Sequence, residues 1–64
     1  SREDLSKIFE EEMDDIAYQS NSEKNRLIIP IVRTIFMSLD AEYKPTYAVI
    51  LILVASMTRD WGTL

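Results

Sequence analysis

The chain has 64 residues, enough for one small domain, and its 47% hydrophobic and 28% charged residues are typical of a globular protein. It has neither histidine nor cysteine and only one glycine, which excludes His/Cys zinc sites, disulfides, Ser-His-Asp or Cys-His catalytic sites and glycine-rich phosphate loops. The net charge of −4 arises in residues 1–26, which carry eight acidic and four basic side chains, and it disfavours nucleic acid as a partner.

The first predicted helix spans residues 2–19. Ser1 and Asp4 have the spacing of a capping box, in which each side chain binds the backbone N–H of the other residue. Apolar residues recur on one side of this helix at intervals of three and four, as a buried stripe requires: Leu5, Ile8, Phe9, Met13 and Ile16. Residues 20–23 are polar and form the predicted connector to the next helix.

The second predicted helix spans residues 24–39, and Pro30 within it leaves its start open. A proline inside a helix removes one backbone hydrogen bond at a cost of about 3 kcal/mol. We therefore expect the helix either to kink at Pro30 or to begin near it, with Pro30 on the polar side together with Arg26 and Arg33. A β-strand over residues 27–32 is the alternative.

The third predicted helix spans residues 45–61. Pro45 suits the first turn of a helix, and Gly62 suits the position after its end. Residues 48–55 are an unbroken apolar run with several β-branched side chains, so a strand over residues 48–54 is an alternative. We favour the helix because the apolar or small stretch is long for a strand and lacks glycine. The run is too short for a membrane span, which takes about 20 apolar residues, and we expect a helix buried on nearly all sides.

These elements predict an all-α fold, in which a helical hairpin and a hydrophobic third helix form one domain over residues 1–64. Because two other helices cannot cover an all-apolar helix completely, we expect assembly into a dimeric helical bundle. Small residues on one side of the third helix would let two helix backbones approach closely. The predicted self-association surface consists of Ala48, Leu51, Ile52, Ala55 and Arg59. The alternative is that this side packs inside the monomer.

Glu12 lies on the apolar side of the first predicted helix, between Ile8 and Ile16. A carboxylate in that position needs a partner, a place at the edge of the domain, or another chain. We consider Glu12 and Arg33 a candidate ion pair across an interface, with Arg59 as the other possible arginine. The simpler interpretation is that a small rotation of the helix brings Glu12 to the solvent.

The same helix carries a cluster of acidic side chains on its polar side. In most proteins such a run is a solvated surface that favours the helix and keeps the chain soluble. Glu11 and Asp15, one turn apart, could also hold a divalent cation, although we predict no metal site. As a functional alternative, the cluster is a candidate face for a basic partner: Glu10, Glu11, Asp14 and Asp15.

The sequence favours a non-enzymatic protein–protein interaction or dimerisation module, regulatory or adaptor in role, that uses the apolar surface of the third helix. The alternative is an acidic inhibitor or antidote that masks a basic surface of a nuclease or DNA-binding protein. We predict no catalytic residue, no cofactor and no membrane span, a homodimer as the main partner, and a second protein with a basic surface as the other. The charged stretch over residues 2–15 does not resemble a signal peptide, and the absence of cysteine agrees with a cytoplasmic location.

Overall fold

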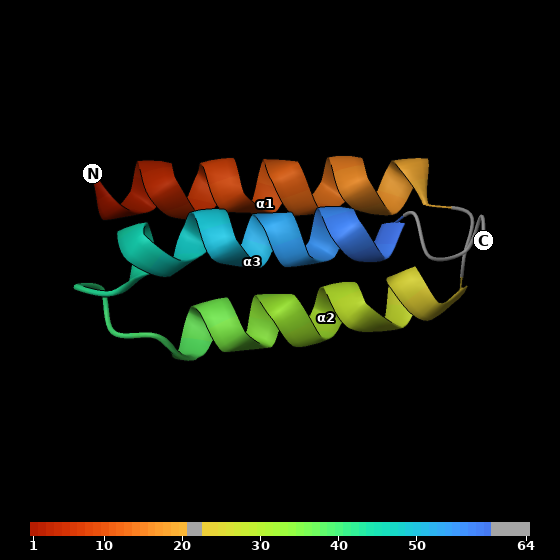
Figure 1. Cartoon of the computed structure of the whole chain (residues 1–64). Coiled ribbons are helices and arrows are strands. Elements are labelled where there is room, and N and C mark those ends of the chain that lie inside the picture. Colours follow the sequence, from red (N-terminus) through yellow and green to blue (C-terminus); the bar gives the residue numbers. More distant parts are fainter. Residues whose placement is uncertain (21–22, 60–64) are drawn as a thin grey trace.

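The computed structural model describes residues 1–20 and 23–59, which form three helices: α1 (Arg2–Gln19), α2 (Glu23–Ser38) and α3 (Lys44–Arg59). The helices lie side by side; α1 and α3 run in the same direction and α2 runs against them (Figure 1). The described part of the chain contains no strand. The segments 27–32 and 48–54, for which a strand was the alternative, are both helical. The predicted all-α fold of three packed helices is therefore confirmed. Trp61 and Gly62, which the sequence placed at the end of the third helix, lie outside the described residues.

The start of α1 is held by the capping box that the sequence predicts. The Ser1 hydroxyl accepts a hydrogen bond from the backbone N–H of Asp4 at 3.3 Å, and the Asp4 carboxylate accepts one from the backbone nitrogen of Ser1 at 3.4 Å. These two bonds satisfy donors that no residue within the helix can pair. Glu3 and Asp4 also place negative charge in the first turn, which the helix dipole favours.

Helix α2 begins at Glu23 and continues through Pro30. Pro30 is exposed, so its ring does not interrupt the buried side of the helix. The Pro30 carbonyl accepts a hydrogen bond from the Thr34 hydroxyl at 2.9 Å. Tertiary packing offsets the cost of proline in the helix, because Ile29, directly before it, and Val32, two positions after it, are both buried in the core.

Lys44 joins the end of α2 to the start of α3. Its ammonium group donates hydrogen bonds to the carbonyl oxygens of Phe36 and Leu39, each at 2.7 Å, and lies 4.9 Å from the centre of the Phe36 ring. The Phe36 carbonyl belongs to the last turn of α2, and the Leu39 carbonyl directly follows the end of the helix. A positive charge is favourable at this end of a helix. Lys44 thereby fixes the beginning of α3 against the end of α2.

The core lies along the axis between the three helices. Each helix contributes three buried apolar residues, spaced by three and four positions: Phe9, Met13 and Ile16; Ile29, Val32 and Phe36; Ala48, Leu51 and Ala55. This spacing is the one that packs helices in bundles and coiled coils. The rings of Phe9 and Phe36 stack between α1 and α2.

Candidate interaction surface

Helix α3 turns its small residues inward and its large apolar residues outward. Its buried positions are Ala48, Leu51, Ala55 and Thr58. Five large apolar side chains of the same helix are between 42 and 63% exposed: Val49, Ile50, Leu53, Val54 and Met57. The sequence predicts a helix that is buried on nearly all sides, and the structure corrects this, because α1 and α2 cover only one side of α3. No charged residue lies between Pro45 and Thr58, so the uncovered side is apolar along most of its length.

Helix α2 adds apolar side chains next to this uncovered side. Leu27, Ile31 and Ile35 are all exposed and follow each other at intervals of one helical turn. Arg33 extends from the other side of α2 to two carboxylates of α1. Leu27, Ile31 and Ile35 therefore lie on the side of α2 that faces away from α1. We call the combined surface the outer apolar face: Leu27, Ile31, Ile35, Tyr47, Ile50, Leu53, Val54 and Met57.

The outer apolar face is continuous across the seam between α2 and α3. Ile35 comes one position before the buried Phe36, and Tyr47 and Val54 come one position before the buried Ala48 and Ala55. In a pair of antiparallel helices, these positions lie next to the core on the sides that face each other. Their exposed fractions, 42 to 46%, are the lowest in the face, as expected for residues that line the seam.

The residues predicted for self-association lie mostly inside the monomer. Ala48, Leu51 and Ala55 are buried in the core, and Ile52 packs partly against it. Arg59 donates a hydrogen bond to the side-chain oxygen of Gln19 on α1 at 2.7 Å. The structure thus places this narrow side of α3 against the other two helices, where a second copy cannot reach the three core residues unless the helices separate.

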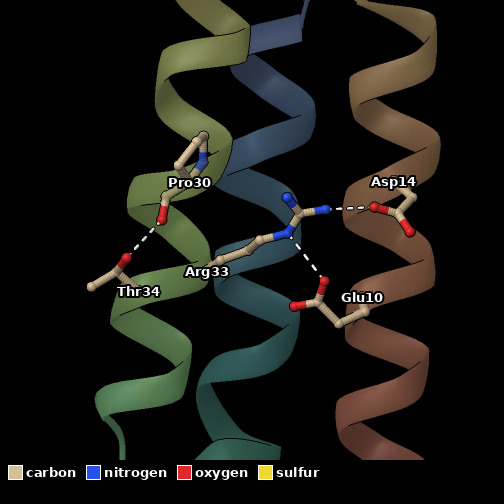
Figure 2. A network of polar contacts seen from close by, with 5 residues as sticks. All are labelled: Glu10, Asp14, Pro30, Arg33 and Thr34. Carbon is tan, nitrogen blue, oxygen red and sulfur yellow. Dashed lines mark hydrogen bonds and ion pairs between the residues drawn. The ribbon is translucent and has the colours of Figure 1, made fainter.

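Arg33 connects α2 to α1 through two carboxylates, as Figure 2 shows. Its Nε lies 3.1 Å from the Glu10 carboxylate, and a terminal guanidinium nitrogen donates to the Asp14 carboxylate. Glu10 and Asp14 are one turn apart, so a single guanidinium can reach both. The arginine is about one third exposed, which makes this a surface ion-pair cluster that holds two helices in register.

Glu12 is not the partner of Arg33 within the chain. It is exposed on α1, while Glu10 and Asp14 occupy the guanidinium group of Arg33. The simpler interpretation, in which Glu12 reaches solvent, agrees with this exposure. The candidate ion pair of Glu12 with Arg33 would have to form between two copies, on a guanidinium group that already contacts two carboxylates.

The acidic cluster on α1 is divided by the same arginine. Glu10 and Asp14 are paired with Arg33, whereas Glu11 and Asp15 are exposed on the outer side of α1. Half of the predicted acidic face is thus partly neutralised inside the protein. Among the residues that the structure describes, no group of three acidic side chains converges on a point that could hold a metal ion.

A buried polar layer closes the end of the bundle where α1 ends and α2 begins, and sequence reasoning did not find it. Asn25 is fully buried, and neither atom of its amide group has a hydrogen-bond partner. The hydroxyl of Ser20 is also buried without a partner, while the hydroxyl of Thr58 donates to the Ala55 carbonyl at 2.8 Å. The signal was present in the sequence, because Asn25 precedes Ile29 by four positions and continues its buried stripe.

Comparison of the chain with protein-family models, with curated proteins and with solved structures found no match. Within the described residues, no helix combines the length and the apolar character that crossing a membrane requires.

Proposed function

We propose that this protein is a non-enzymatic interaction module that dimerises through the outer side of α3. The observation that carries the proposal is the orientation of α3, which buries two alanines and exposes Leu53, Val54 and Met57. Exposed apolar surface of this extent is uncommon on a monomer and marks an interface. A cytoplasmic location remains part of the prediction.

The size of the core supports the same proposal. Among the described residues, nine buried apolar side chains form it, two of them alanine, and the sequence has neither cysteine nor histidine to supply a disulfide or a zinc site. Small domains without such reinforcement gain stability by association, because a second copy buries apolar surface that the monomer leaves in water. Dimerisation would supply this burial at the side of α3 that α1 and α2 do not cover.

The acidic-inhibitor alternative has less support. It requires the carboxylates of α1 to face a basic partner, and Arg33 already pairs with two of the four. Reversing the charge of Glu11 and Asp15 discriminates between the proposals. Dimerisation through α3 predicts no loss of self-association, whereas the inhibitor proposal predicts loss of binding to a basic partner.

The proposal is tested by sedimentation velocity on Leu53→Glu, with Tyr18→Glu as the control. Both side chains are exposed, but Leu53 lies on α3 and Tyr18 on the outer side of α1. We expect the unaltered chain and Tyr18→Glu to sediment as dimers and Leu53→Glu to sediment as a monomer with unchanged helical circular dichroism. A dimer that tolerates Leu53→Glu as well as Tyr18→Glu would contradict the proposal.

A further inference from the structure

We infer that two copies pair through the whole outer apolar face, so that α2 and α3 of both copies form a four-helix core and both α1 helices lie outside it. This inference rests on the proposed dimerisation and extends it in two respects. It assigns Leu27, Ile31 and Ile35 of α2 to the interface, and it fixes how the two copies face each other. None of these three residues belongs to the self-association surface that the sequence predicts.

The outer apolar face is large enough for a dimer interface. Eight large side chains contribute, and each is roughly half exposed. Half of a large side chain's surface is about 100 Å², so the face is on the order of 800 Å², which matches what each partner buries in a standard interface. The largest apolar patch on a typical monomer is smaller, about 300–600 Å². The exposed side chains of α3 alone give only part of the area that a stable dimer needs, and α2 supplies the remainder.

The distribution of charge also favours contact through this face. Seven of the eleven acidic residues of the chain lie on α1, and the outer apolar face itself contains none. Two copies with a net charge of −4 repel each other, and the repulsion is smallest when the acidic helices are far apart. Contact through the α2–α3 side separates the two α1 helices by the full thickness of the four-helix core. Contact through α1 would bring the acidic residues together.

The outer apolar face is also suited to pairing with its own copy. Ile31 and Leu53 lie near the middle of α2 and α3, which run antiparallel, and the apolar residues extend on either side of them. A two-fold axis through the middle of such a face brings apolar residues of one copy onto apolar residues of the other along its whole length. Ridges of side chains one turn apart, such as those of Leu27, Ile31 and Ile35, then pack into the grooves of the facing helices.

A matched pair of isoleucines tests the inference. Ile31 on α2 and Ile8 on α1 are 58 and 54% exposed, and the same substitution introduces the same charge at each. We expect Ile31→Glu to raise the dimer dissociation constant about a hundredfold, because it buries a carboxylate without a partner, and Ile8→Glu to change it less than about twofold. Leu27→Glu, on the same side of α2, is measured alongside, so that the result does not depend on one variant remaining folded.

The outcomes separate this inference from the proposed function. If Leu53→Glu breaks the dimer while Ile31→Glu and Leu27→Glu behave like Ile8→Glu, the four-helix arrangement is wrong and dimerisation through α3 alone stands. If none of the α2 and α3 variants weakens the dimer, both are wrong. A chain that stays monomeric at every concentration and instead pellets with phosphatidylcholine vesicles would replace the second copy with a lipid surface.

Discussion

Phe9 of α1 and Phe36 of α2 stack with their ring centres 3.9 Å apart and their planes within 5° of parallel. Both side chains are completely or almost completely buried, and they are the two largest in the core. The two rings fill the space between α1 and α2, and the third helix must pack beside them. Helix α3 contributes two alanines, Ala48 and Ala55, to the same core, and such small residues let its backbone approach the other two helices closely.

Replacing either ring with alanine is expected to remove a large share of the stability. A Phe→Ala substitution in a core costs about 3–5 kcal/mol, since it removes buried apolar surface and leaves a cavity. We expect Phe36→Ala to lower the free energy of unfolding by this amount in urea titrations followed by circular dichroism. Met37→Ala, at an exposed neighbouring position, is the control and should change it by less than about 1 kcal/mol. Similar losses for both variants would mean that the stacked pair does not organise the core.

The sequence was sufficient for the three helices, because helical periodicity and the Ser1–Asp4 capping box are local signals. It did not predict the direction in which α3 faces. Residues 47–57 are apolar or small on every side, so periodicity cannot distinguish the inner side from the outer one. Which side of α3 faces inward depends on the sizes of the side chains that α1 and α2 contribute to the packed core.

The ion-pair partners of Arg33 likewise could not be predicted from helical periodicity alone. Glu10 follows the buried Phe9 by one position, and Arg33 follows the buried Val32 by one position. On antiparallel helices these positions face each other, whereas Glu12, directly before the buried Met13, lies on the other side of α1. To predict Glu10 instead of Glu12 as the partner of Arg33, one would need to know which residues of α1 are buried. Periodicity alone does not determine this set, because it leaves the rotation of α1 about its axis uncertain.

The lysine that closes α2 is expected to contribute more to stability than an ordinary surface lysine. Lys44→Gln removes the charge that binds two carbonyl oxygens at the end of α2 and should lower the free energy of unfolding by about 1–2 kcal/mol. Lys7→Gln, at an exposed position of α1, removes the same charge elsewhere and should change it by less than about 0.5 kcal/mol. Thermal melts of the two variants at one concentration provide the comparison, and equal effects would contradict the capping role of Lys44.

The Arg33 cluster is expected to give a small coupling energy that depends on salt. A double-mutant cycle of Arg33→Gln with Glu10→Gln should yield about 0.5–1 kcal/mol at low salt, because both groups are partly exposed, and less at 1 M salt. A second cycle of Arg33→Gln with Glu11→Gln serves as the control and should yield a value near zero. A coupling that is equal in the two cycles would show that net charge, rather than the contact, is responsible.

Asn25 is expected to lower the stability of the bundle. Its buried amide has no hydrogen-bond partner, so replacing it with leucine, which has the same number of side-chain heavy atoms, removes the cost of an unsatisfied polar group. We expect Asn25→Leu to raise the free energy of unfolding by about 1–3 kcal/mol in urea titrations. Asn25→Ala is the companion variant, because it removes the amide without filling the space and should gain less. A loss of stability in Asn25→Leu would contradict this account and point to a bound water molecule on the amide.

The central claim is that the outward side of α3 is covered by a second copy of the chain. Sedimentation equilibrium over a hundredfold range of concentration, with a thermal melt at each end of the range, tests it most directly. A dimer whose melting temperature rises with concentration is the predicted result, because association then contributes to the stability of the fold. A monomer with the same melting temperature at every concentration would contradict the claim, since the three helices would then be stable with the outer apolar face exposed to water.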